Sequence, residues 1–124
     1  MTYKILIADD EPNIVISLEY LMKREGYEVT VARDGQEAID AILRERPDLI
    51  LLDVMMPKKT GFEVCQEVRA HEQVKDTLIL MLTAKGREAD VAKGMALGVN
   101  DYVTKPFSTK ELARRVREML ERTP

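Results

Sequence analysis

Short apolar segments alternate five times with segments of helical periodicity along this chain of 124 residues, and this alternation restricts the fold more than any other feature. Several of the short segments are apolar at nearly every position, as strands are when both faces of a parallel sheet are covered by helices. The alternation therefore predicts a doubly wound α/β fold. The strands are expected at YKILIA (3–8), YEVTVA (27–32), DLILLD (48–53), TLILML (77–82) and DYVT (101–104).

The segments between the strands carry the start and stop signals of helices. In the first of them, Pro12 stands near the start and Gly26 just past the end, the usual asymmetry of a helix. In the last, Ser108 and Glu111 have the spacing of a capping box. No repeat or linker interrupts the pattern, so we expect one domain over residues 1–124. The helices are expected at residues 11–25, 34–46 (stopping before Pro47), 61–72, 86–98 and 108–123.

The order of the strands determines which side chains meet. Right-handed crossovers restrict the order, and for five strands we expect 2-1-3-4-5, with ligands beyond the carboxyl ends of the strands. The first and third strands are then neighbours, about 4.8 Å apart. Asp9 and Asp10 follow the first strand, and Asp53 ends the third. Three carboxylates are therefore expected at one edge of the sheet.

Carboxylates this close together raise one another's pKa unless a cation neutralises them. Oxygen ligands with open positions suit Mg²⁺, which keeps several waters and shares its ligands with phosphate. Thr83 and Lys105 end the fourth and fifth strands, so they add a hydroxyl and an ammonium at the same edge. The sequence predicts a magnesium site there.

Composition excludes other classes of protein. The 19 Lys and Arg residues are outnumbered by 22 Asp and Glu residues, so the basic excess of a nucleic-acid-binding domain is missing. Cys65 is the only cysteine, which excludes an internal disulfide and fits a reducing compartment. The beginning, MTYKILIADDEP, has the pattern of neither a signal peptide nor a membrane span. We expect a cytoplasmic domain, with Cys65 in the core and His71 at the surface.

Four segments together make the sequence resemble the receiver domains of two-component response regulators, over essentially the whole chain. They are ADDEP (8–12), LILLDVMMPKKTGFEV (49–64), MLTAKG (81–86) and GVNDYVTKPF (98–107). The resemblance, which includes chemotaxis regulators, implies a flavodoxin-like fold and a phosphoprotein that receives phosphorelay signals. It implies a sensor histidine kinase or a phosphotransfer protein as partner, and no direct contact with nucleic acid or membrane.

The resemblance also implies the roles of the residues at the sheet edge. Asp53 would be the phosphoacceptor, and Lys105 would pair with a phosphoryl oxygen, directed by a cis peptide bond to Pro106. Thr83 and Tyr102 would form the switch pair, in which the hydroxyl binds the phosphoryl group and the ring turns inward. The resemblance therefore implies a phosphoacceptor signalling domain and not an enzyme with a separate substrate.

The magnesium ligands implied by the resemblance come from two strand ends. Asp10 and Asp53 would bind Mg²⁺ directly, Asp9 mainly through a metal-bound water, and Met55 through its backbone carbonyl. Two side chains of the family tune the lifetime of the aspartyl phosphate, and here they are Met55 and Lys85. Neither orients a water well, so slow self-dephosphorylation is expected.

The output partner would contact the face formed by residues 86–98, 101–104 and 108–123. An alternative is the receiver fragment of a DNA-binding transcriptional regulator, because Asp101, Glu111 and Arg115 match the charges through which such receivers dimerise. Val91 and Leu97 stand where charges usually complete that pattern, which argues against this dimer. A phosphotransferase of the haloacid-dehalogenase type is a weaker alternative, since such enzymes have a second Asp two residues after the nucleophile, where this chain has Met55.

Overall fold

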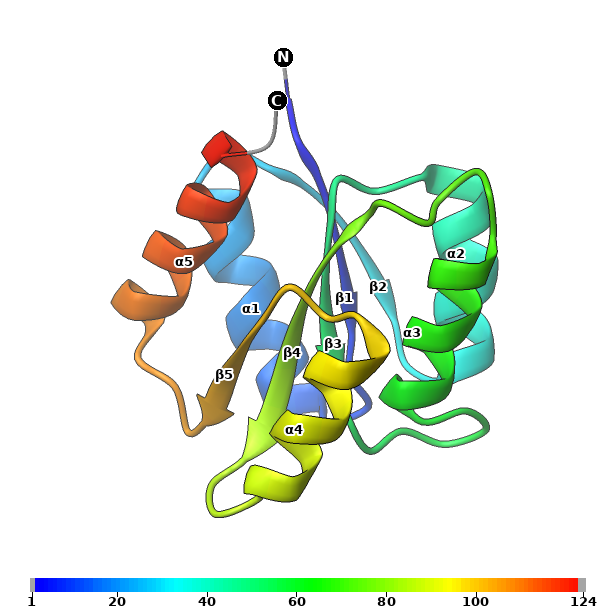
Figure 1. Cartoon of the computed structure of the whole chain (residues 1–124). Coiled ribbons are helices and arrows are strands. Elements are labelled where there is room, and N and C mark those ends of the chain that lie inside the picture. The colour runs from blue at the N-terminus through cyan, green and yellow to red at the C-terminus, as the bar shows by residue number, and fades with distance from the viewer. Residues whose placement is uncertain (1, 123–124) are drawn as a thin grey trace.

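The computed structural model describes residues 2–122 and contains a five-stranded sheet between two layers of helices (Figure 1). The strand order is β2-β1-β3-β4-β5, and every neighbouring pair is parallel. The predicted fold class and strand order are therefore confirmed. The strands are β1 (Lys4–Ala8), β2 (Glu28–Ala32), β3 (Leu49–Asp53), β4 (Leu78–Ala84) and β5 (Asp101–Lys105).

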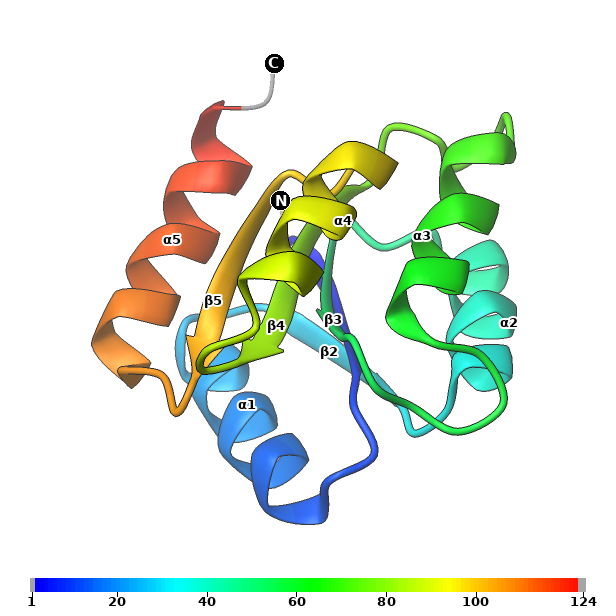
Figure 2. The same ribbon diagram turned by 60° about the horizontal axis from the view of Figure 1, so that its bottom comes forward.

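Helices cover both faces of the sheet. In two views related by rotation, α1 and α5 lie together on one face, while α2, α3 and α4 cover the other (Figures 1 and 2). The predicted end of the last helix, Thr123, lies outside the described residues. The helices are α1 (Pro12–Arg24), α2 (Gly35–Glu45), α3 (Gly61–Ala70), α4 (Glu88–Leu97) and α5 (Thr109–Arg122).

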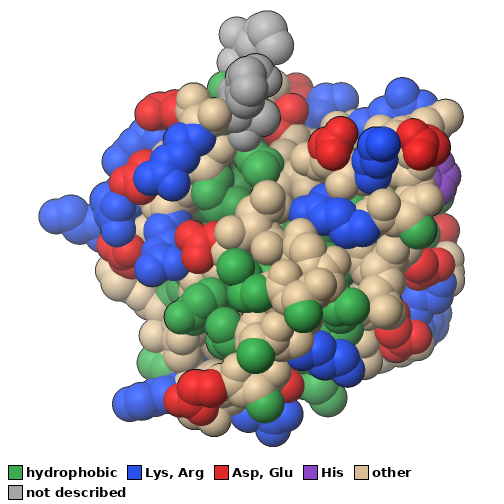
Figure 3. All heavy atoms as spheres, in the orientation of Figure 1, with side chains coloured by type: hydrophobic (Ala, Val, Ile, Leu, Met, Phe, Trp, Pro, Cys, Tyr) green, Lys and Arg blue, Asp and Glu red, His purple; other side chains and the backbone are tan. Residues whose placement is uncertain are grey.

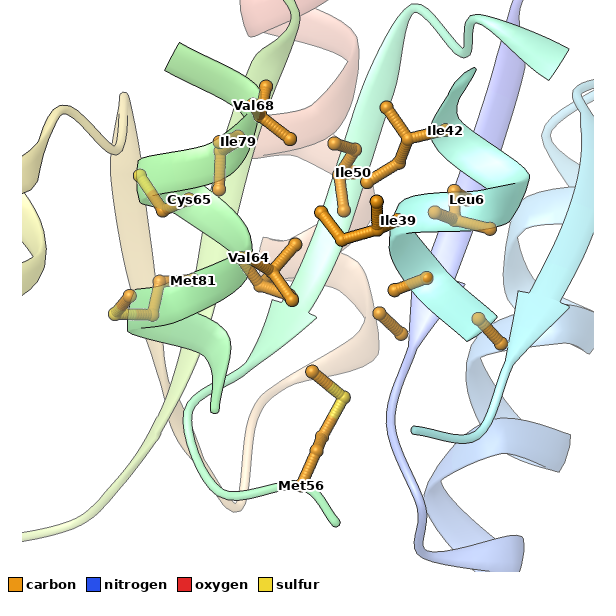
Figure 4. Close-up of a cluster of buried hydrophobic side chains, with 14 of the residues drawn as sticks. Leu6, Ile39, Ile42, Ile50, Met56, Val64, Cys65, Val68, Ile79 and Met81 are labelled. Atoms are coloured by element: carbon orange, nitrogen blue, oxygen red, sulfur yellow. The ribbon is translucent and has the colours of Figure 1, made fainter. Parts of the chain in front are cut away.

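Successive side chains of the central strands enter two separate cores. In β3, Ile50 and Leu52 pack toward α2 and α3, whereas Leu49 and Leu51 pack toward α1 and α5. Figure 4 shows the first of these cores, with Ile39 and Ile42 of α2 facing Ile50. Burying one such aliphatic side chain contributes roughly 1.5–3 kcal/mol, so the uninterrupted apolar runs hold both layers on the sheet.

The structure confirms the prediction that Cys65 belongs to the core, since the residue is fully buried. His71 is only partly exposed, because it ends α3 and its Nδ1 accepts a hydrogen bond from the backbone N–H of Gln73 at 3.4 Å. Its predicted surface position is therefore right only in part.

The capping signals are placed differently from the prediction. Ser108 accepts a hydrogen bond from the backbone N–H of Glu111 at 3.2 Å, but the Glu111 carboxylate binds Arg114 and Arg115 instead of completing the box. A reciprocal capping box occurs at the start of α3, between Thr60 and Glu63.

The fourth strand and the helix after it have other boundaries than expected. Strand β4 continues past Thr83 to Ala84, because these residues pair with Thr104 and Lys105 of β5. Gly86 then adopts a φ of 82°, which delays the start of α4 until Glu88. Only Gly94 of α4 is buried, and a Cβ there would lie 2.7 Å from the sulfur of Met81. The α4 backbone therefore lies close to the Met81 side chain at Gly94, and Leu97 of the same helix also packs against the core.

Candidate functional site

Three carboxylates meet where β1 and β3 end, at the lower edge of the sheet in Figure 1. Asp9, Asp10 and Asp53 each offer one oxygen, and these oxygens lie within 4.8 Å of one another. Asp9 is fully buried and Asp53 is 7% exposed, whereas Asp10 faces solvent. The predicted neighbourhood of strands one and three thus brings all three acids together.

The backbone around Asp53 is held by a close approach of the loop that follows it. The N–H of Gly61 donates a hydrogen bond of 2.8 Å to the carbonyl of Val54, which folds the segment between them back onto β3. A Cβ on Gly61 would lie 2.3 Å from the carbonyl oxygen of Asp53. No side chain fits at that separation, so the glycine allows this loop to close behind the carboxylate.

Lys105, the last residue of β5, contacts the acids directly. Its Nζ lies 2.9 Å from Asp9 Oδ2 and 3.3 Å from Asp53 Oδ1, and it also contacts Glu11 Oε1 at 3.3 Å. The peptide bond between Lys105 and Pro106 is cis. The ammonium therefore bridges the ends of β1 and β3 from the far side of β4.

Burial and charge change the acid–base properties of this group. Burial, with the neighbouring Asp9 charge, raises the pKa of Asp53 from 3.8 to about 6, although Lys105 opposes the shift. Burial alone would lower the pKa of Lys105, but its hydrogen bond to Asp9 and the charges of Asp53 and Asp9 raise it overall. At neutral pH, Asp53 is therefore mostly a carboxylate beside a charged ammonium.

The hydroxyl of Thr83 lies buried at the end of β4. Its Oγ1 has no hydrogen-bond partner among the described residues, and the residue is 2% exposed. A buried polar group without a partner costs free energy, so such groups call for an explanation. The end of β4 thus carries an unpaired hydroxyl within the described part of the chain.

Tyr102 lies on the neighbouring strand and is 38% exposed, which makes it one of the large side chains with an outward position. A cavity of about 270 Å³ lies between β4, β5 and the start of α4, and Thr83 and Tyr102 both line it, together with Val91. The ring therefore has a space beside it that it does not fill.

A larger cavity of about 390 Å³ opens over the acids, and it shows what sequence reasoning missed. Its walls include Asp10, Asp53, Met55 and Lys105, all of them predicted, and three charged residues that were not. Glu11 directly follows the acid pair, so its position in the sequence could have revealed it. Arg87 and Asp90 gave no signal, because only the turn before α4 brings them to the cavity. Met55 is 66% exposed at this cavity, and Lys85 is exposed in the nearby loop.

The charged residues of the predicted output face pair within the chain. Arg115 contacts Asp101 and Glu111, each at 3.1 Å, and donates to the carbonyl of Tyr102 at 2.8 Å. Leu97 is partly buried and packs against the core, which explains an apolar residue at that position. Figure 3 shows charged side chains over α5 and hydrophobic ones between α5 and α4.

A sequence model described as the response regulator receiver domain matches residues 5–117. The chain belongs to this family. Receiver domains are signalling domains of two-component systems and pair with histidine kinases or phosphotransfer proteins, which confirms the resemblance at the level of the family. None of the helices within residues 2–122 is long and apolar enough to span a membrane.

Solved receiver structures match nearly the whole chain. A protein of Chloroflexus aurantiacus J-10-fl is 38% identical with a TM-score of 0.94, covering 98% of this chain and 100% of that one. The chemotaxis protein CheY4 of Vibrio cholerae is 36% identical with a TM-score of 0.89, covering 95% and 98%. The receiver domain of a sensor histidine kinase of Pseudomonas aeruginosa, with a magnesium ion in its active-site cleft, is 32% identical with a TM-score of 0.90, covering 98% and 99%.

The donor set of this receiver fits Mg²⁺. All three acidic side chains provide hard oxygen ligands, and the exposed position of Asp10 leaves room for the waters that Mg²⁺ retains. A divalent cation would also relieve the repulsion that contributes to the raised pKa of Asp53.

Without Mg²⁺, we expect Asp53 to lower the stability of the domain as the pH rises from about 4 to 6. The folded domain binds this proton more tightly than the unfolded chain does, since the pKa is raised from 3.8 to about 6, so stability is lost on deprotonation. The loss is roughly 1–3 kcal/mol of unfolding free energy, because one pKa unit corresponds to about 1.4 kcal/mol.

Urea unfolding at several pH values, compared with Asp53→Asn, measures this loss as the difference between the two proteins. Asp40→Asn, a change at an exposed position of α2, should behave like the wild type. An Asp53→Asn protein whose stability follows the wild-type pH profile would assign the effect to another group.

Proposed function

We propose that this receiver accepts a phosphoryl group on Asp53 from the phosphohistidine of a sensor histidine kinase or phosphotransfer protein, using Mg²⁺, and signals by a change of conformation. The observation that carries the proposal is the contact of Lys105 with a buried Asp53 carboxylate beside Asp9 and Asp10. A buried thiol without a disulfide, Cys65, supports a reducing, cytoplasmic setting for this function.

In the transfer step, an oxygen of Asp53 forms a bond to phosphorus while the P–N bond of the phosphohistidine breaks. The electron pair of that bond leaves with the imidazole nitrogen, and the product on this chain is an aspartyl phosphate. Such transfers depend on positioning and on charge stabilisation. Lys105 supplies both, because its ammonium already lies 3.3 Å from an oxygen of the acceptor.

Mg²⁺ would be held by Asp10, Asp53 and the backbone carbonyl of Met55, and Asp9 would act through a metal-bound water. The cation would neutralise negative charge on the phosphoryl group during its transfer. The raised pKa of Asp53 means that binding of a cation also helps to keep the acceptor ionised. The chain is itself the acceptor of the phosphoryl group, so it turns over no separate substrate.

The switch is proposed to begin at Thr83. A phosphoryl oxygen would accept a hydrogen bond from its unpartnered hydroxyl and draw the end of β4 toward the acids. Tyr102 could then turn from its outward position into the adjoining cavity. A local contact that favours one of two arrangements shifts the population between them. The partner would read the change at the face of α4, β5 and α5.

The acceptor assignment is tested with acetyl phosphate and Mg²⁺. The wild type should gain one phosphoryl group by intact-protein mass spectrometry, and Asp53→Asn should gain none, because an amide oxygen does not form the acyl phosphate. Asp48→Asn, at the opposite edge of the sheet, is the control and should be modified normally. Full modification of Asp53→Asn would overturn the proposal.

Thr83→Ala should be phosphorylated but should switch poorly, because the variant lacks the hydroxyl that contacts the phosphoryl group. Thr83→Ser keeps that hydroxyl and should switch. Proton NMR of the Tyr102 ring, with and without phosphorylation, measures the response. An equal response of the Tyr102 ring in the alanine and serine variants would show that the ring moves independently of the Thr83 hydroxyl.

The aspartyl phosphate should be long-lived, because Met55 and Lys85 are poorly suited to orient an attacking water. Met55→Asn combined with Lys85→Glu should shorten its half-life, measured by mass spectrometry after the donor is removed. The matched control combines Met95→Asn with Lys110→Glu, two exposed positions away from the acids, and should leave the half-life unchanged. An equal shortening in both double variants would contradict the assignment.

A further inference from the structure

Two charged residues of the cavity over the acids take no part in the function proposed above. The cavity that contains Asp53 and Lys105 is also lined by Arg87 and Asp90. Arg87 is the N-cap residue of α4, and Asp90 lies in the first turn of that helix. The start of α4 therefore brings one cation and one anion to the phosphoacceptor.

The two cations of this cavity are engaged to different degrees. Lys105 is shared by three carboxylates, as described above. Among the described residues, the Arg87 guanidinium is hydrogen-bonded to Asp90 alone, with Nε 2.9 Å from Oδ2 and a terminal nitrogen 3.3 Å from Oδ1. The Arg87 side chain is 59% exposed. Arg87 is thus a solvated cation held by a single acid one helical turn away.

Phosphorylation changes the charge that faces Arg87. A phosphoryl group carries about 1.5–2 negative charges near neutral pH, against one for the Asp53 carboxylate that it replaces. The guanidinium fork binds carboxylate and phosphate in the same bidentate way, so Asp90 and a phosphoryl group are interchangeable partners for it.

We propose that Arg87 is a second phosphoryl-binding residue, which Asp90 holds in the unmodified domain and releases to the group on Asp53. The inference rests on the proposed function, because it needs a phosphoryl group at Asp53. Asp90 stays stabilised after the exchange, since a carboxylate in the first turn of a helix faces the positive end of its dipole.

The backbone at this point permits the exchange. Arg87 makes no side-chain capping bond to α4, and Gly86 with its φ of 82° directly precedes it. The first turn of α4 has no buried residue, because Gly94 is the one residue of this helix that is buried. A phosphoryl group that binds Arg87 would therefore hold the start of the helix directly. The aspartyl phosphate would then have a contact to α4 that is separate from the hydroxyl of Thr83.

A double-mutant cycle with beryllofluoride, a phosphoryl mimic, tests the proposal. Its affinity in the presence of Mg²⁺ is measured by calorimetry for the wild type, Arg87→Ala, Asp90→Ala and the double variant. Arg87→Ala should bind about two- to fivefold more weakly, the range of an exposed ion pair. Asp90→Ala should bind more tightly, since it removes the competitor, and the double variant should match Arg87→Ala.

Three outcomes would overturn the proposal. Equal affinity of Arg87→Ala and wild type would remove the contact. Weaker binding by Asp90→Ala would mean that the pair only stabilises the start of α4. An equal gain from Asp90→Ala with and without Arg87 would show a general effect of charge and no competition.

Further variants separate this inference from the function on which it rests. Arg87→Lys keeps the charge without the fork and should bind with intermediate affinity. Arg114→Ala removes a similar i,i+3 pair, with Glu111 on α5, and should bind like the wild type. Urea unfolding without the mimic checks that each variant is folded. If the wild type binds no beryllofluoride, the proposed function fails; if it binds and Arg87→Ala is unaffected, this inference alone fails.

Discussion

The ammonium group of Lys105 allows two acidic side chains to lie buried next to each other at the end of the sheet. Asp9 and Asp53 are both buried where two neighbouring strands end, and like charges in such a position oppose each other. Lys105 lies 2.9 Å from one and 3.3 Å from the other, so its charge offsets part of the repulsion. The offset is incomplete, because the pKa of Asp53 stays raised to about 6. The Asp9 and Asp53 carboxylates thus still repel each other, and a further cation would reduce that repulsion.

Strand β3 and helix α4 differ in how deeply their residues are buried. Every residue of β3 is buried, and its side chains alternate between the two cores, so Asp53 stands at the end of a strand that is packed on both faces. Helix α4 begins at the same edge of the sheet but buries a single glycine. A buried carboxylate at the end of a fully buried strand thus lies beside the largely exposed start of a helix.

The sequence predicted the fold and the acidic group well, because both depend on strands that are apolar throughout. Such runs determine the parallel sheet, and the sheet then fixes which strand ends are neighbours, so the meeting of Asp10 and Asp53 followed without any knowledge of loops. What could not be predicted depends on loop conformation. Arg87 reaches the cavity only because Gly86 turns the chain before α4, and no periodicity reports that turn. The carboxylate of Glu111 likewise had several competing partners, and it binds arginines in place of the backbone.

The end of the Met81 side chain fills the space beside Gly94, which has a consequence for evolution and design. A side chain at position 94 would have to displace the sulfur and terminal methyl of Met81 or move α4 outward. The distance of α4 from the sheet therefore depends on the combined volume of the side chains at positions 94 and 81. Receivers that differ in this volume would present the same surface residues at different heights, and so favour different partners without any change to the surface itself.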